Sequence, residues 1–179
     1  MGTRERVTLT ARRVLALAYF FIAFAACSGP TETPLASLPE GGVFVTVAIG
    51  RGNTPTLIVK IRPDKAGFHV YSTDLNPALT RGLGIPTRIR IVDGLGATGA
   101  QRARPQAETL RIETLGVSLP VYPDGTVTIT TRVIATNSAR ATVAISYGAC
   151  SKSVCLKPVI ERRLTFTLPH WLIDSQRRV

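Results

Sequence analysis

Apolar side chains alternate with polar ones along most of this chain. From residue 43 onward, they recur at every second position in a series of short runs. An alternation of period two is typical of β-strands that bury one face. The positions that share a face are Val43, Val45, Val47 and Ile49; Leu57, Val59 and Ile61; Phe68 and Val70; Ile89 and Ile91; Val127, Ile129 and Val133; Val143, Ile145 and Tyr147; and Leu164, Phe166 and Leu168.

Turn-forming residues separate these runs, at positions 50–53, 63–67, 93–94 and 123–125. Short strands with one apolar face each predict two sheets packed face to face. We therefore expect an all-β, immunoglobulin-like β-sandwich of about seven to nine antiparallel strands. Residues 94–118 have the least regular pattern and are interpreted as a long loop that carries one or two short strands.

The first 26 residues have the pattern of an export signal. A basic segment that includes Arg12 and Arg13 precedes an apolar stretch of about 13 residues, which suits a signal peptide and is too short to span a bilayer. Two alanines then precede Cys27, as in the lipobox of bacterial lipoproteins, and this resemblance implies cleavage before Cys27 and lipidation of that residue. Ser28 after the cysteine favours the outer membrane by the same analogy. An ordinary secretory signal with cleavage nearby is the alternative.

Four segments follow from these patterns: a lipoprotein signal peptide at 1–26, a flexible tether at 27–40, one folded domain at 41–168 and a loosely ordered tail at 169–179. The tether is predicted from its content of Pro, Ser, Thr and Gly. Trp171 in the tail is expected to be able to pack on the sandwich.

The chain is strongly basic, with 22 Lys and Arg against 11 Asp and Glu, a formal charge of +11. Removing residues 1–26 lowers this to about +8. A nucleic-acid partner is not expected in an exported protein. Single arginines along strands, such as Arg88, Arg90 and Arg132, indicate a solvated outer face.

The most informative feature is a pair of cysteines, Cys150 and Cys155, between two predicted strands. In an oxidising compartment such a pair favours a disulfide over a zinc site. A loop this short contributes only about 2 kcal/mol of stability, and a small ring is easier to reduce than a long-range crosslink. The pair is therefore interpreted as redox-active.

Three sequence segments resemble the N-terminal periplasmic domain of DsbD, a thiol:disulfide interchange protein. The first reads Tyr-Gly-Ala-Cys-x4-Cys-Leu-x-Pro over residues 147–158, the second Gly-Phe-His-Val-Tyr-Ser over 67–72, and the third Val-Tyr-Pro-Asp-Gly over 121–125. The resemblance covers residues 40–168 and implies an immunoglobulin-like fold without a cofactor. It also implies a thiol-disulfide oxidoreductase component in the periplasm, which passes electrons from a membrane thiol reductase to periplasmic thioredoxin-like proteins.

Carried over position by position, the resemblance makes Cys150 and Cys155 the redox couple, with His69 and Tyr71 against it and Cys155 as the sulfur that faces the partner. Strand alternation independently places His69 and Tyr71 on one face, opposite the core. Lys152 and Lys157 flank the cysteines, which predicts a thiol pKa below that of free cysteine. The family's shielding loop corresponds to residues 73–86, where the only acid is Asp74 and there is no aromatic residue.

Two other interpretations stay open. In one, the chain is a non-catalytic binding or scaffold lipoprotein in which the Cys150–Cys155 bond is permanent. In the other, the two cysteines bind Cu(I), together with His69, as in a metal chaperone. A hydrolase is not indicated, because the chain has only two histidines and no nucleophile motif.

Overall fold

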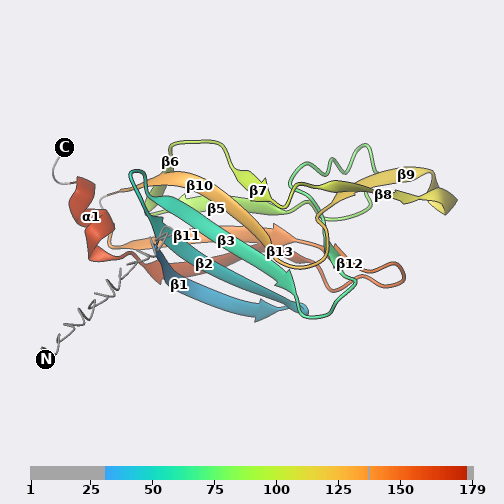
Figure 1. The fold of residues 1–179 in the computed structure, drawn as a ribbon, viewed down its shortest axis with the longest axis horizontal. Helices are drawn as coiled ribbons and strands as arrows, with labels where there is room; N and C mark the ends of the chain where they lie inside the picture. Colours follow the sequence, from blue (N-terminus) through green and yellow to red (C-terminus); the bar gives the residue numbers. More distant parts are fainter. Residues whose placement is uncertain (1–30, 137, 177–179) are drawn as a thin grey trace, which may run out of the picture.

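The computed structural model describes residues 31–136 and 138–176 as a two-sheet sandwich in which all strand pairs are antiparallel (Figure 1). The predicted signal peptide and the lipidation site Cys27 lie outside the described residues. One sheet contains β1 (Thr31–Glu40), β2 (Val43–Arg51), β3 (Thr56–Pro63), β10 (Val127–Ala135), β6 (Leu95–Ala97) and β7 (Arg102–Arg104). The other contains β13 (Val159–Thr167), β11 (Arg140–Tyr147) and β5 (Arg88–Asp93). The predicted all-β, immunoglobulin-like fold is confirmed.

The apolar alternation of the sequence forms the core between these sheets. In the β2–β3 pair, Val45 lies opposite Ile61 and Val47 opposite Val59, so that the predicted faces coincide. The same core includes the inward side chains of β10 and β11. Its members are nearly inaccessible to solvent, which is the main source of stability for such a sheet pair.

The segment at 31–40 is a strand and not the flexible tether expected from its composition. β1 pairs with β2 from Thr31 to Glu40, with a break in register between Pro34 and Ala36. Prolines are tolerated at such a place because β1 is an edge strand. Leu35, Ala36 and Leu38 pack against the core, and this tertiary contact outweighs the loop-like composition.

A buried tyrosine joins the two sheets at this edge. Tyr147 is 1% exposed, and its hydroxyl donates to the backbone oxygen of Glu40, 2.8 Å away. Burial, reinforced by the Glu40 carboxylate, raises the pKa of Tyr147 to about 12. The hydroxyl therefore remains a donor at physiological pH.

The tail is also more ordered than expected, because α1 (His170–Gln176) closes one end of the sandwich. Leu172 is fully buried in the core, and Trp171 packs against that core with the Arg51 guanidinium 5.4 Å from its ring centre. In the described ranges, no helix has both the length and the apolar character needed to cross a membrane.

The opposite end of the molecule carries two further strand pairs (Figure 1). β8 (Glu108–Ile112) pairs with β9 (Val117–Val121), joined by the 3-10 helix Glu113–Leu115, and β12 (Ala149–Cys150) pairs with β4 (His69–Val70). Residues 94–118 thus contain β6, β7 and β8 and the start of β9, more strands than the predicted loop. Apolar residues of β8 and β9, such as Leu110 and Leu119, form a second small core next to the cysteines.

Candidate functional site

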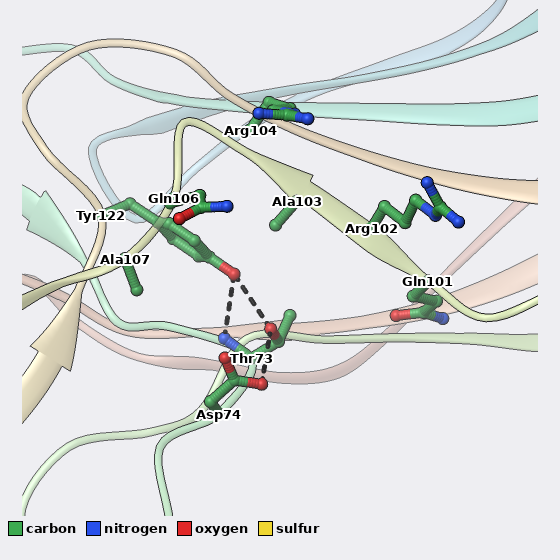
Figure 2. A pocket seen from close by; sticks show the side chains of 9 residues that line it. All are labelled: Thr73, Asp74, Gln101, Arg102, Ala103, Arg104, Gln106, Ala107 and Tyr122. Atoms are coloured by element: carbon green, nitrogen blue, oxygen red, sulfur yellow. Dashed lines mark hydrogen bonds between the residues drawn. The ribbon is translucent and has the colours of Figure 1, made fainter.

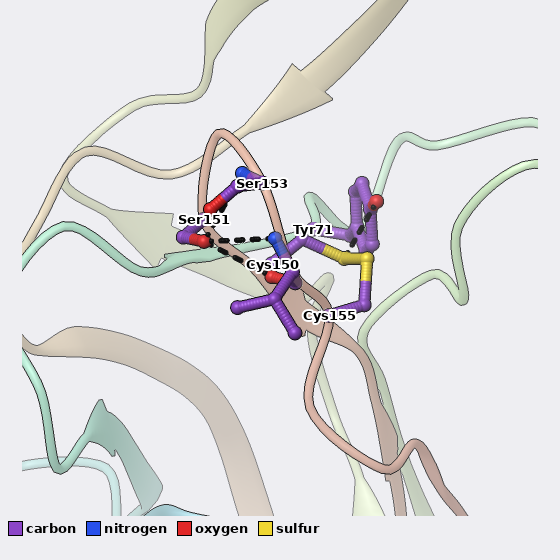
Figure 3. The surroundings of a disulfide bond; sticks show 6 residues. Tyr71, Cys150, Ser151, Ser153 and Cys155 are labelled. Carbon is purple, nitrogen blue, oxygen red and sulfur yellow. Dashed lines mark hydrogen bonds between the residues drawn. A yellow bond between two sulfur atoms is a disulfide. The ribbon is translucent and has the colours of Figure 1, made fainter.

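The candidate site is the tight hairpin that follows β11 in the chain, and Figure 3 shows its two cysteines. The Ser151 hydroxyl accepts hydrogen bonds from the backbone N–H groups of Ser153 and Val154, which fixes the turn. Backbone bonds across the hairpin then bring its two arms together, and the Cys150–Cys155 disulfide links them with an S–S distance of 2.01 Å. The two predicted cysteines are therefore paired with each other.

The two sulfurs have different surroundings. Cys155 is exposed, whereas Cys150 is partly buried and packs against the second core. The Tyr71 hydroxyl donates a hydrogen bond to Cys150 Sγ over 3.1 Å. A partner thiolate can thus approach Cys155, while Cys150 is held by a donor that would stabilise negative charge on its sulfur.

Strand pairing brings Tyr71 to the disulfide. The Tyr71 N–H donates to the Gly148 carbonyl at 3.1 Å, directly beside the β4–β12 pair. Tyr71 is only 7% exposed, because Leu75, Leu119 and Val121 cover its ring. His69 and Tyr71 share a strand face opposite the main core, as predicted. This face was expected to point outward, but at Tyr71 it is buried against the second core. Sequence alternation could not show that the loop after Tyr71 and β9 fold over this side.

Burial also determines the protonation state of Tyr71. Removal from water raises the pKa of its hydroxyl above the ordinary value of 10.0. The proton is therefore retained across the neutral range, and the group can donate to Cys150 whether that sulfur is bonded or free.

The loop that follows Tyr71 covers the ring and leaves the disulfide accessible. Gly84 has φ +82°, and a Cβ at this position would lie 3.0 Å from both the Tyr71 ring and Leu75. Glycine lets the loop approach this closely. Between the loop and the hairpin, an open hollow of about 180 Å³ is lined by Gly82, Gly84 and Ile85 on one side and by the cysteines, Leu156 and Pro158 on the other.

The other predicted site residues lie on both sides of the disulfide. His69 is directly opposite Cys150 in the β4–β12 register, and its Nδ1 is 3.2 Å from Asp124 Oδ1. Lys152 and Lys157 are exposed on the hairpin. Sequence reasoning gave no site role to Asp124, which it placed in a turn and in the third segment of the resemblance. The Tyr-Pro-Asp-Gly segment indicates a turn, but nothing in it indicates that Asp124 lies beside His69.

A larger polar hollow, of about 460 Å³, lies away from the cysteines (Figure 2). The hydroxyl of the buried Tyr122 lies at one side, where it accepts from Thr73 N at 3.2 Å and contacts Thr73 Oγ1 at 2.9 Å. In the part of the chain that the structure describes, no three His, Cys, Asp or Glu side chains gather as a metal site would require.

The fold is similar to that of domains of known structure. It is similar to the N-terminal periplasmic domain of ScsB from Proteus mirabilis, with a TM-score of 0.50 and 14% identity over 84% of this chain and 59% of that one. The chain thus spans less than two thirds of that structure. The N-terminal domain of DsbD from Neisseria meningitidis, in its reduced form, matches with a TM-score of 0.39 and 16% identity over 77% of this chain and 90% of that one.

No protein-family model matches the chain, and neither does any curated protein. At these identities the likeness to solved structures concerns the fold. At the level of the fold, the resemblance stated from the sequence segments is confirmed.

Tyr71→Phe is expected to slow the reaction of the disulfide with a dithiol by about tenfold. The change removes one hydrogen bond to a sulfur that becomes charged, and such bonds contribute roughly 1.5–3 kcal/mol. Stopped-flow mixing with dithiothreitol would give the rate. Tyr122→Phe is the matched control, because it removes a buried hydroxyl that bonds Thr73 and not a cysteine. Equal rates for the two variants would contradict the role given to Tyr71.

Proposed function

We propose that this chain is a thiol-disulfide interchange domain of the bacterial periplasm, which carries electrons through the Cys150–Cys155 couple. The observation that supports this best is the asymmetry of the bond: an exposed Cys155 sulfur joined to a Cys150 sulfur that accepts the Tyr71 hydroxyl. The fold shared with periplasmic domains agrees with the proposal.

The exchange begins when a partner thiolate attacks Cys155 Sγ in line with the disulfide. A bond forms between the partner sulfur and Cys155, the Cys150–Cys155 bond breaks, and its electron pair leaves on Cys150 as a thiolate. The partner's second thiolate then attacks the mixed disulfide and releases Cys155, so that two electrons enter the domain and the partner becomes oxidised. The reverse sequence passes the electrons on.

The hairpin also provides contacts for a partner. Val154 at its tip is 56% exposed, and the open hollow beside the disulfide is mostly apolar. Lys152 and Lys157 add positive charge that attracts a thiolate. We propose a membrane thiol reductase as the electron donor and periplasmic thioredoxin-like proteins as acceptors.

The proposed anchor is a lipid on Cys27, which would place the domain on the periplasmic side of a membrane, the outer one by the analogy of Ser28. Lipidation can be tested separately from redox function. Labelled fatty acid fed to expressing cells is expected to enter the wild-type chain and not the Cys27→Ala variant. Equal labelling of both chains would contradict the anchor.

A redox titration decides between exchange and a permanent crosslink. The full chain is equilibrated in thiol-disulfide buffers of graded potential, quenched with acid and alkylated, and the modified Cys150 and Cys155 peptides are quantified by mass spectrometry. A cycling couple is expected to have a potential above about −300 mV and to accept electrons from a reduced thioredoxin-like protein within minutes. A potential below that value, with no transfer, would instead support the scaffold interpretation.

A further inference from the structure

Next to the disulfide lies a histidine–carboxylate pair, His69 and Asp124, that has no role in the exchange steps described above. His69 Nδ1 is buried and 3.2 Å from Asp124 Oδ1, in an alignment that falls short of a hydrogen bond. The other carboxylate oxygen, Asp124 Oδ2, accepts the Gly67 N–H at 2.9 Å. This bond holds Asp124 against the turn that leads into β4, and the other side of its carboxylate faces the imidazole.

The strand register places His69 directly opposite Cys150, in the antiparallel β4–β12 pair. Side chains in such positions lie on the same face, with Cβ atoms roughly 4.5–5.5 Å apart. Nδ1 of His69 faces Asp124, so the other ring nitrogen, Nε2, lies on the side of the ring away from the carboxylate. Tyr71, two residues further along the same strand face, already contacts Cys150 Sγ.

We propose that Asp124 and His69 form a positioning pair that places a positive charge beside Cys150, where it stabilises the sulfur that leaves when the disulfide opens. The inference rests on the proposed function. With a proton on both ring nitrogens, the imidazole is a cation that pairs with Asp124, and this cation and the Tyr71 hydroxyl act together on the Cys150 thiolate. No proton has to move during the step, since the electron pair of the broken bond stays on Cys150.

The elements next to His69 carry several ionisable groups. Asp124 faces Nδ1, Tyr71 shares its strand face, and Cys150 lies across the strand pair. Asp64 and Lys65 are exposed in the turn before β4, and Lys152 is exposed on the hairpin. Among these groups only Asp124 lies within ion-pair distance of the His69 ring, so Asp124 is the group to change.

The test uses the full chain carrying Cys155→Ser, in which Cys150 is a free thiol. Iodoacetamide labelling of the Cys150 peptide is followed by mass spectrometry from pH 5 to 10, which keeps Cys27 separate. Adding Asp124→Asn keeps an acceptor for the Gly67 N–H and removes the charge. The midpoint of Cys150 labelling is expected to rise by about one pH unit, so that labelling below the midpoint slows by about tenfold.

The direction of the change is diagnostic. A carboxylate acting directly on Cys150 would disfavour the thiolate, so its removal would lower the midpoint; action through His69 requires a rise. His69→Gln is expected to give the same rise, and Asp124→Asn added to it no further rise. Asp174→Asn, which removes an exposed carboxylate on α1 at the other end of the molecule, is the control and is expected to leave the midpoint unchanged.

A fall in the midpoint, or no change with Asp124→Asn and His69→Gln, would overturn the inference. If Asp124→Asn does not fold, His69→Gln tests the same claim with the Asp124–Gly67 bond retained. The labelling needs neither a partner nor a redox cycle. A wild-type disulfide that fails to exchange therefore counts against the proposed function alone, and an unchanged midpoint counts against the positioning pair alone.

Discussion

Cys150→Ser is expected to capture disulfide partners readily, whereas Cys155→Ser captures them at least tenfold more slowly. In the first variant the remaining thiol is the exposed Cys155, and in the second it is the partly buried Cys150 beneath the Tyr71 hydroxyl. Access to the attacking sulfur is one determinant of exchange rate, and here it differs most between the two positions. The measurement is the rate at which each reduced variant forms a mixed disulfide with an oxidised thioredoxin-like protein, followed on the Cys150 or Cys155 peptide.

A denatured sample provides the control for this asymmetry. In concentrated urea both thiols are exposed in similar sequence surroundings, so the two rates should agree within about twofold. A large difference that persists after unfolding would place its cause in the local sequence and not in the fold. Faster capture by Cys155→Ser in the native state would reverse the roles given to the two sulfurs.

The sequence predicted the sandwich well because the central strands contact solvent on one side and the core on the other. This contrast produces the alternation along β2, β3, β10 and β11. β1 lacks that signal: its pairing depends on the free edge of β2, which is a tertiary property. The β8–β9 hairpin did carry an alternation, in Leu110 and Ile112 and again in Val117 and Leu119, which went unrecognised among polar neighbours.

For the candidate site, sequence reasoning selected residues on the cysteine hairpin together with His69 and Tyr71, but not the link between Asp124 and His69. The cysteines could be selected from their spacing, and His69 and Tyr71 from the family resemblance, with which their shared strand face agrees. Asp124 approaches β4 only because β9 passes beside Tyr71, as the Tyr71–Val121 bridge shows. No local pattern in either segment encodes that approach.

Gly94→Ala is expected to destabilise the fold by at least about 3 kcal/mol. Gly94 lies between β5 and β6, where the chain passes from one sheet to the other, and it has φ +79°. A Cβ at this position would lie 2.0 Å from the Arg140 carbonyl oxygen and 2.5 Å from Ala141 Cα. Both are backbone atoms of β11, so one strand must move to make room. Urea unfolding followed by circular dichroism would give the change in free energy.

Gly116→Ala separates backbone conformation from this steric effect. Gly116 also has a positive φ, of +60°, but a Cβ there would meet nothing within 4 Å. Only the cost of the left-handed conformation remains, about 1 kcal/mol. If the two alanine variants lost equal stability, the clash with β11 would not matter, and the close approach of the two sheets at this corner would have no energetic consequence. A loss at Gly94 several times larger than that at Gly116 would show that the close approach of this corner to the start of β11 is what requires a glycine.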